Sequence, residues 1–234
     1  MKFIQCLQGS QEWLNARAGV ITASCFADAI SVLSRNTGSR KPGDPSAAAD
    51  KYASDLAIEQ ISGRPYGEPP KAWTLARGHE LEPHARAQYE ASTGNLAQEA
   101  GVVLSDDGAF GYSTDGLVNP SASADTEDGL ASCEGLIEIK CPIDSQKILA
   151  IWQTGDVSEY MEQMQGGMWL TGAKWCDFIM YVPDLEAVGN DLYVTRVMRD
   201  EDFIEAMSGK LIQFSRRVAA FKALLSASKT ESAS

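Results

Sequence analysis

A five-residue stretch near the middle of the chain, Leu136–Lys140, places the narrowest limit on what this sequence can fold into. Apolar and mostly β-branched residues dominate the stretch Leu-Ile-Glu-Ile-Lys, which predicts a short buried strand. Residues two apart on a strand share a face, so Glu138 and Lys140 point in the same direction. An acid and a base on an otherwise apolar strand either neutralise each other or serve a ligand, because an isolated buried charge is costly.

A second acid, Asp115, lies upstream in the segment Gly-Tyr-Ser-Thr-Asp-Gly-Leu of residues 111–117. Two carboxylates supply hard oxygen ligands, and together with one ammonium group they are the parts of a magnesium-dependent phosphodiesterase site. Two plainer interpretations stay open at this point. Asp115 with the following glycine is also typical of a simple turn, and Glu138 with Lys140 is also consistent with a structural ion pair.

Charge and cysteine content narrow the class of protein. The net charge of −12 argues against a nucleic-acid partner, since affinity for the phosphate backbone comes mainly from Lys and Arg. Segregation of the charges, with a basic channel on one face, would remove that objection. The sequence has no apolar run long enough to span a membrane and no signal core after Met1, and its five scattered cysteines lack a C-x-x-C pair, so we expect a cytoplasmic protein with reduced thiols.

Helical patterns dominate the first part of the chain, and strand patterns follow, interrupted by helices. This order predicts an α/β (α+β) fold with a central mixed β-sheet flanked by helices, forming a single domain over residues 1–225 with a disordered tail at 226–234. A mobile basic loop is expected at 35–45 and a polar acidic loop at 119–133. The expected helices cover residues 10–17, 22 to about 33, 46–61, 73–93 with a kink at Pro83, 144–154, 157–171 and 200–226, and the expected strands cover 98–104, 109–113, 134–140, 175–182 and 191–198.

Five short motifs occur in one order between residues 10 and 200. They are Arg17-Ala-Gly-Val-Ile-Thr-Ala-Ser24, Arg77-Gly-x-x-x-Glu82, Ser113-Thr-Asp-Gly-Leu117, Glu138-Ile-Lys-Cys-Pro142 and Tyr160-Met-Glu-Gln-Met-Gln165. With these motifs the chain resembles the phage lambda exonuclease, or YqaJ-like viral alkaline exonuclease, family within the PD-(D/E)XK nuclease superfamily. The resemblance implies a restriction-endonuclease-like core and Mg²⁺-dependent 5′→3′ digestion of one strand of linear double-stranded DNA from its ends. It also implies a ring-shaped homotrimer and a single-strand annealing protein as partner in phage recombination.

The resemblance assigns metal ligands to four positions. Asp115, Glu138 and the backbone oxygen of Ile139 are the implied ligands, and two Mg²⁺ ions are expected, with Mn²⁺ able to substitute. Glu82 is implied to bind the second ion directly or through water, although a solvated helix acid is the plain alternative. Thr114 stands where the family usually has a proline.

Three further residues receive roles near the reacting phosphate. Lys140 is implied to orient or deprotonate the attacking water, and a lowered pKa would suit it as a base. Gln163 is implied to hold this water or a backbone phosphate, and Tyr160, three residues earlier, shares its helix face and is expected to contact DNA. A polar position on an amphipathic helix is the alternative for Gln163.

A pocket for the 5′-terminal phosphate is implied at Arg17, Ser24 and Ser113, because the guanidinium fork matches phosphate oxygens. Thr22 and Ser24 open a predicted helix, whose free N–H groups are suited to an anion but are equally consistent with plain capping. Trp13 is expected either to stack on a base or to be a core anchor. The family has a further basic residue after the strand motif, and here Gln146 or Lys147 must take its place.

The sequence therefore predicts a metal-dependent exodeoxyribonuclease that releases 5′ mononucleotides and leaves a 3′ single-stranded overhang. Two alternatives stay open. One is a structure- or sequence-specific endonuclease on the same core, and the other is a non-catalytic protein that binds DNA ends.

Overall fold

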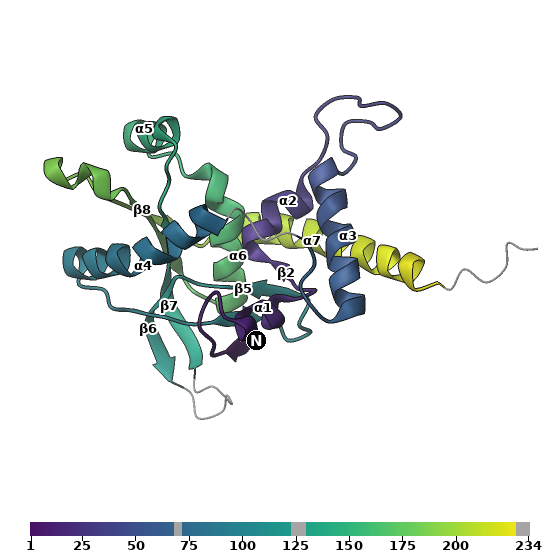
Figure 1. Cartoon of the computed structure of the whole chain (residues 1–234), viewed down its shortest axis with the longest axis horizontal. Coiled ribbons are helices and arrows are strands. Elements are labelled where there is room, and N and C mark those ends of the chain that lie inside the picture. Colours follow the sequence, from purple (N-terminus) through teal and green to yellow (C-terminus); the bar gives the residue numbers. More distant parts are fainter. Residues whose placement is uncertain (68–71, 123–129, 228–234) are drawn as a thin grey trace, which may run out of the picture.

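The computed structural model describes residues 1–67, 72–122 and 130–227, and two β-sheets with helices on their faces make up the fold (Figure 1). Strand order is β3-β6-β7-β8-β9 in the larger sheet and β1-β4-β5-β2 in the smaller one. In chain order the elements are β1 (Lys2–Ile4), α1 (Gln11–Arg17), β2 (Ile21–Thr22), the 3₁₀ turn η1 (Ala23–Cys25), α2 (Phe26–Ile30), α3 (Ala47–Ser62), α4 (Ala72–Thr93), β3 (Ala97–Gln98), β4 (Val102–Leu104), β5 (Phe110–Tyr112), β6 (Gly116–Ala122), β7 (Leu130–Lys140), α5 (Ser145–Thr154), η2 (Ser158–Tyr160), α6 (Met161–Thr171), β8 (Trp175–Tyr181), η3 (Pro183–Val188), β9 (Leu192–Met198) and α7 (Glu201–Ser226).

The larger sheet is mixed, as the sequence predicts. β7 and β8 run parallel, with Glu138 opposite Phe178, and the remaining pairs in this sheet are antiparallel. β6 begins at Gly116, which pairs with Ile137. Asp115 therefore comes just before β6, at the level of β7 where Glu138 and Lys140 stand.

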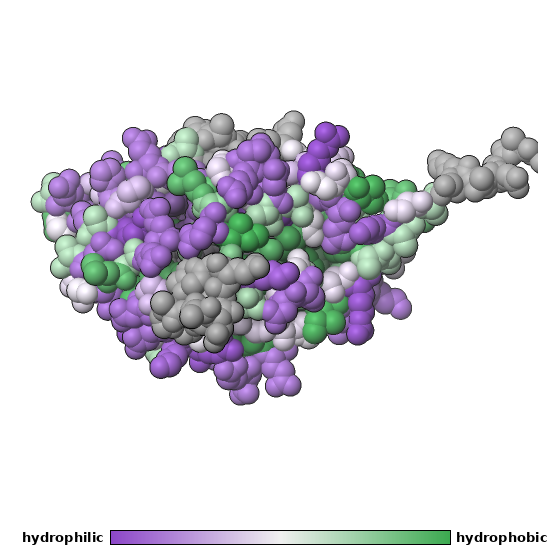
Figure 2. All heavy atoms as spheres, turned by 90° about the horizontal axis from the view of Figure 1, so that it is seen from below, coloured by the Kyte–Doolittle hydropathy of each residue, from purple (hydrophilic) through white to green (hydrophobic). Residues whose placement is uncertain are grey.

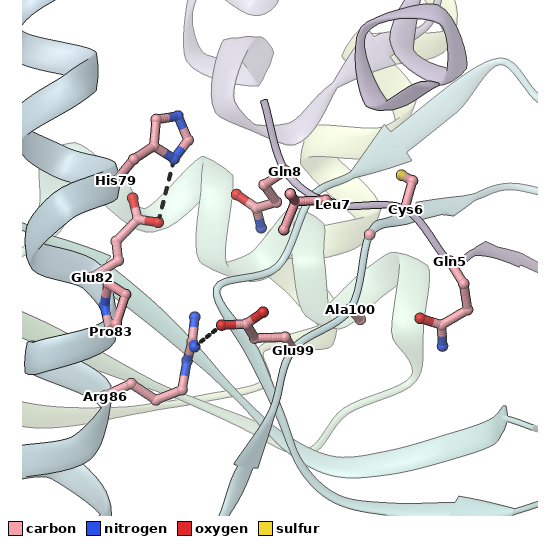
Figure 3. Close-up of a pocket in the computed structure, with 11 residues that line it drawn as sticks. Gln5, Cys6, Leu7, Gln8, His79, Glu82, Pro83, Arg86, Glu99 and Ala100 are labelled. Carbon is pink, nitrogen blue, oxygen red and sulfur yellow. Dashed lines mark hydrogen bonds and ion pairs between the residues drawn. The ribbon is translucent and has the colours of Figure 1, made fainter. Parts of the chain in front are cut away.

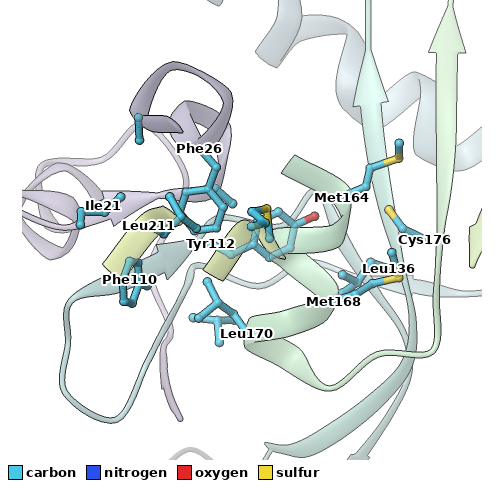
Figure 4. Packing of buried hydrophobic residues seen from close by; sticks show 14 of the residues in the cluster. Ile21, Phe26, Phe110, Tyr112, Leu136, Met164, Met168, Leu170, Cys176 and Leu211 are labelled. Atoms are coloured by element: carbon cyan, nitrogen blue, oxygen red, sulfur yellow. The ribbon is translucent and has the colours of Figure 1, made fainter. Parts of the chain in front are cut away.

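Alternation along the strands assigns one layer of helices to each face of this sheet. Ile137 and Ile139 of β7 pack in one cluster with residues of α4, whereas Leu136 packs in the other with residues of α6 and α7. Side chains on a strand alternate between faces, so Glu138 and Lys140 lie on the α6 side with Leu136. Figure 4 shows Met164 and Met168 of α6 beside Leu136 and Cys176 of the sheet, with Tyr112 and Phe26 on the other side of the helix.

The smaller sheet places the end of α1 beside the segment that leads into Asp115. Ile21 of β2 pairs with Phe110 of β5 in parallel, and Phe3 of β1 pairs with Val103 of β4. Because β5 ends at Tyr112, the pairing of β2 with β5 carries the end of α1 to the segment that leads into Asp115. These strands have two or three residues each, too few for a hydrophobic period, and the sequence did not predict β1 or β2.

Two predicted strand and loop segments differ from the structure. The strand expected at 98–104 is two strands in different sheets, β3 and β4, joined by a short link at Glu99–Gly101. The loop expected at 119–133 is wrong at both ends, because β6 extends to Ala122 and β7 begins at Leu130; residues 123–129 lie outside the described part. Pro120 pairs with Cys133 beyond the last β3 contact at Val118, where a missing N–H removes no ladder bond on the other side.

The helix expected from residue 22 to about 33 is also corrected. It consists of η1 and a five-residue α2, and it ends before Leu33, whose N–H donates to Asp44 in a loop. Thr22 makes no side-chain capping bond to this helix. Arg40, in the loop expected to be mobile, pairs with Asp50 of α3 at 2.8 Å. The tail expected at 226–234 falls mostly outside the described residues.

α4 continues through Pro83, so this proline does not end the helix.

Figure 2 shows hydrophilic side chains over most of one face, interrupted by separate hydrophobic patches. In the part of the chain that the structure describes, no helix combines the length and hydropathy needed to cross a bilayer.

Gly167 lets α6 approach β5 closely. A Cβ atom at this position would lie 2.7 Å from Cζ of Tyr112, which is fully buried. We expect Gly167→Ala to destabilise the fold by about 1–3 kcal/mol through overpacking, measured by urea denaturation. Gly209 of α7 has no atom within 4 Å of such a Cβ, so Gly209→Ala serves as control and should gain up to about 1 kcal/mol of stability. A Gly167→Ala protein as stable as the parent would contradict the close approach.

Candidate active site

Glu138 is the centre of a buried hydrogen-bond network on the α6 face of the sheet. Glu138 is only 1% exposed. One carboxylate oxygen accepts from Lys140 Nζ at 2.6 Å and from Gln163 Nε2 at 2.6 Å, and the other accepts from the Tyr112 hydroxyl at 3.2 Å. Lys140 also donates to Gln163 Oε1 at 3.3 Å. The strand β7, the helix α6 and the strand β5 thus each contribute a side chain that fixes this carboxylate.

Asp115 meets this group from the turn before β6. Its Oδ2 atom accepts a 2.7 Å hydrogen bond from the backbone N–H of Ile139, the residue between Glu138 and Lys140. The hydroxyl of Thr114 bonds to the N–H of Gly116 at 3.1 Å and to its carbonyl at 2.9 Å, which restrains the turn. Thr114 therefore supplies by hydrogen bonding the restraint that a proline would supply by its ring.

Glu82 approaches the same group from α4 and lines a cavity of about 480 Å³ between this helix and the N-terminal segment. Figure 3 shows its carboxylate beside His79, with Nδ1 to Oε2 at 3.7 Å, and Arg86 one turn further along the helix. Arg86 pairs with Glu99 across the cavity. Glu82 therefore lies at the edge of the site and forms part of the cavity wall.

The carboxylates influence one another's ionisation. Burial raises the pKa of Asp115 well above its usual value, and the negative charge of Glu138 raises it further. Burial also raises the pKa of Glu82. Burial alone would lower the pKa of Lys140, but the carboxylates of Glu138 and Asp115 outweigh burial and raise it. The lowered pKa expected for Lys140 is therefore not found in this state of the site, where Lys140 is the cation that balances the acids.

This donor set fits a hard divalent cation. Carboxylate oxygens are the ligands that Mg²⁺ prefers, and it commonly uses one or two of them together with water and substrate phosphate. Acids whose burial and mutual repulsion disfavour the charged form gain most from such a cation. Among the described residues, no group of three or more His, Cys, Asp or Glu side chains is arranged to hold a metal ion by itself.

A second polar group adjoins the first. The Arg17 guanidinium donates to the Ser113 hydroxyl at 2.7 Å, and Trp13 Nε1 donates to the same oxygen at 3.0 Å. The second terminal nitrogen of Arg17, Nη2, lies 3.5 Å from the hydroxyls of Thr22 and Ser24. Arg17 also lies 4.2 Å from the ring centre of Trp13, whose side chain is partly buried.

Arg17 is a partly buried cation that has no ion-pair partner among the described residues. Burial lowers its pKa from the usual value. Within the described residues the arginines that form ion pairs are Arg40, Arg86, Arg196, Arg199 and Arg217, and Arg17 is absent from this set. A cation held among hydroxyl groups without a carboxylate is suited to receive an anion from solution.

The ring of Tyr160 lies close to two lysines at the site, Lys140 and Lys147. This ring lies 5.6 Å from Lys140 Nζ and 5.0 Å from Lys147 Nζ, and it packs on Phe178 with ring centres 4.9 Å apart. Lys147 also pairs with Glu159 at 2.7 Å. Of the two residues considered for the basic position after the strand motif, Lys147 is the one that the structure places beside the site, whereas the side chain of Gln146 is exposed.

Three residues at the site were missed by the sequence reasoning. Tyr112 donates to Glu138, Gln8 donates to the backbone carbonyl of Thr114, and Arg86 donates to the backbone carbonyl of Asp115. Tyr112 comes immediately before the motif that begins at Ser113, and that position was the available signal. Gln8 and Arg86 carry no local pattern, because only the tertiary fold makes their contacts.

Comparisons with known proteins place this geometry in a family. The model of the YqaJ-like viral recombinase domain matches residues 12–174. The chain is 32% identical to an alkaline exonuclease (LHK-Exo) from Laribacter hongkongensis over 92% of this chain and 96% of that chain, with a TM-score of 0.71. The structure of LHK-Exo in complex with dAMP gives 31% identity over the same shares, with a TM-score of 0.73.

A more distant solved structure shares the fold alone. A phage-related exonuclease from Haemophilus somnus 129PT is 15% identical over 88% of this chain and 95% of that chain, with a TM-score of 0.57. No curated protein matches the chain.

Proposed function

Because the chain belongs to the YqaJ-like viral recombinase domain family, we propose that it is an exodeoxyribonuclease of the phage recombination type. It would digest one strand of linear double-stranded DNA from the 5′ end, with Mg²⁺, and release 5′ mononucleotides. The similarity to an alkaline exonuclease along almost the whole of both chains supports this reaction class. By the same kinship we propose a homotrimeric ring that encloses DNA and a single-strand annealing protein that receives the 3′ overhang.

The observation that carries the proposal is the meeting of Asp115, Glu138 and Lys140 at one end of the larger sheet. Asp115 contacts the backbone of Ile139, and Lys140 contacts Glu138, so one short stretch of β7 connects all three side chains. Such a group is unfavourable unless it serves chemistry, since a buried acid and a partly buried acid face one base. It supports hydrolysis of a phosphodiester better than a purely structural ion pair.

Each residue then has a definable task. Asp115, Glu138 and the Ile139 carbonyl would hold the Mg²⁺ ions, with Glu82 at the second ion. When bound, these ions would activate the attacking water and neutralise charge on the phosphate. Lys140 and Gln163 would orient that water, since the ammonium and the amide already share one oxygen of Glu138.

The position of Arg17 explains why mononucleotides would be released. Ser113, which holds Arg17, is two residues from Asp115. Residues two apart have Cα atoms at most roughly 7 Å apart, which is on the scale of one nucleotide of DNA backbone. Arg17, Ser24 and Ser113 would therefore hold the terminal 5′ phosphate while the next phosphate lies at the acids, with Trp13, Thr22 and Tyr160 lining the path of the strand.

End dependence and polarity test this proposal. A linear duplex labelled at its 5′ ends, the same duplex labelled at its 3′ ends, and a covalently closed circle would each be incubated with Mg²⁺. We expect immediate release of the 5′ label, delayed release of the 3′ label and an intact circle. Cleavage of the circle would identify an endonuclease instead, and tight binding of ends without any product would identify a binding protein.

Arg17→Ala should remove the preference for 5′-phosphorylated ends. Charge-assisted hydrogen bonds contribute roughly 1.5–3 kcal/mol, so the ratio of initial rates on phosphorylated and hydroxyl ends should fall about tenfold or more. Arg17→Lys keeps the charge without the fork and should keep only part of the ratio. Arg216→Ala, at an exposed position of α7, is the control and should leave the ratio unchanged. Equal rates on the two kinds of end by the parent protein would refute the pocket.

A further inference from the structure

The turn that carries Asp115 is held at two successive backbone carbonyls by side chains from distant parts of the chain. Gln8 Nε2 donates to the carbonyl of Thr114 at 2.7 Å. Arg86 Nε donates to the carbonyl of Asp115 at 3.1 Å. Both side chains line the cavity beside Glu82, Gln8 from the N-terminal segment and Arg86 from α4 (Figure 3). The turn before β6 therefore depends on tertiary contacts for its placement.

Arg86 is the more extensively bound of the two. It lies one helical turn after Glu82 on α4, and its side chain is only 14% exposed. While Nε holds the Asp115 carbonyl, Nη1 pairs with Glu99 in the link between β3 and β4. One guanidinium thus connects the helix that carries Glu82, the turn that carries Asp115 and the link from the larger sheet to the smaller one.

We propose that Arg86 is a positioning residue that fixes the Asp115 turn against α4, so that Asp115 and Glu82 are set for one pair of divalent ions. The inference rests on the proposed function, because it takes these acids as metal ligands. A guanidinium suits this task because its planar fork directs two N–H groups to two acceptors at once. Outer contacts that orient metal ligands typically change metal affinity or activity by about 10–100-fold when they are removed.

Charge and positioning make opposite predictions for the loss of Arg86. Removal of a positive charge near a cation site by itself strengthens cation binding, because a repulsion disappears. Loss of a fixed Asp115 turn weakens cation binding, because the ligands must be ordered when the ion arrives. The sign of the change in affinity therefore separates a positioning role from a purely electrostatic one.

Titration with Mn²⁺, followed by calorimetry and by the electron paramagnetic resonance signal of the free ion, measures this sign without DNA or turnover. We expect Arg86→Gln to bind Mn²⁺ about tenfold or more weakly than the parent. The double variant Arg86→Gln/Glu99→Gln preserves net charge and should show the same loss. Arg86→Lys keeps the charge but loses the fork, and it should also bind more weakly; it serves as the test if Arg86→Gln does not fold.

Gln88→Ala is the matched control on the same helix. Gln88 bonds to Asp191 at 2.8 Å, away from the Asp115 turn, so its loss should affect the docking of α4 but leave Mn²⁺ affinity within about twofold of the parent. Parent-like or tighter Mn²⁺ binding by the folded Arg86 variants would overturn the positioning role alone. A parent protein that binds no Mn²⁺ and degrades no DNA would overturn the proposed function, and the positioning role with it.

Discussion

Replacement of Glu138 by glutamine is expected to abolish release of nucleotides from linear duplex DNA while the chain stays folded. Glutamine keeps the size of the side chain and one carbonyl oxygen to accept from Lys140 and Gln163, and its amide N–H can donate to the Tyr112 hydroxyl, so the packing changes little. The lost charge is the one on which the site depends, because Glu138 is 1% exposed and directly contacts Lys140 and Gln163. Loss of a direct metal ligand should lower the rate by at least about 10²-fold.

A buried acid outside the site separates this effect from a general effect of removing a buried charge. Asp177 of β8 is 2% exposed and accepts from Arg196 at 2.7 Å and from the Tyr89 hydroxyl at 2.7 Å, on the α4 face of the sheet. Asp177→Asn should lower the free energy of unfolding without changing the rate per folded molecule. Glu138→Gln with a rate within tenfold of the parent, in a protein shown to be folded by circular dichroism, would remove Glu138 from the ligand set.

Replacement of Lys140 by alanine should lower the maximal rate by about 10²–10⁴-fold, the usual contribution of a positioned proton acceptor or donor. Lys140 is the cation that meets the acids directly, and its Nζ lies 2.6 Å from Glu138. Lys140→Arg distinguishes orientation of the attacking water from its deprotonation, because a guanidinium keeps the charge but cannot give up its proton. Rates at saturating DNA, with DNA binding measured separately by fluorescence anisotropy, would give the comparison.

Lys147 provides the contrast for Lys140. Its ammonium lies 5.0 Å from the same Tyr160 ring but pairs with the exposed Glu159 instead of a site carboxylate. Lys147→Ala should therefore raise the DNA concentration needed for half-maximal rate and leave the maximal rate nearly unchanged. A Lys140→Ala protein that behaves in the same way would show that Lys140 binds phosphate and does not act on the water.

The sequence predicted the strands of the larger sheet that carry strong patterns. β8 is rich in aromatic residues and β7 ends in alternating Ile137 and Ile139, and the structure confirms strands at both places. β6 was missed because Asn119 and Pro120 resemble loop residues, although Pro120 lies beyond the part of β6 that pairs with β3. In the smaller sheet the predicted strand at 109–113 corresponds to β5, whereas β1 and β2 were missed because they have three residues or fewer and long-range pairing alone defines them.

The contacts of the site also divide into those that the sequence predicted and those that only the fold reveals. Glu138 and Lys140 are two apart on one strand, so local geometry predicts their shared direction, and the structure confirms it. The meeting of Arg17 with Ser113, 96 residues apart, was expected from the family motifs, and no spacing argument could have given it. Gln8 and Arg86 bind backbone carbonyls, which every residue possesses, so no side-chain pattern marks the partner and only the fold reveals the contact.

The dependence of DNA hydrolysis on a divalent cation tests most directly whether these acids and this amine form a nuclease site. Acid-soluble nucleotide would be measured over time from linear 5′-phosphorylated duplex with the parent protein, after removal of metal by a chelator and then after addition of Mg²⁺ or Mn²⁺. We expect no release without metal and steady release of mononucleotides once either ion is present. Equal release with and without metal, or none with any cation, would contradict the site described above.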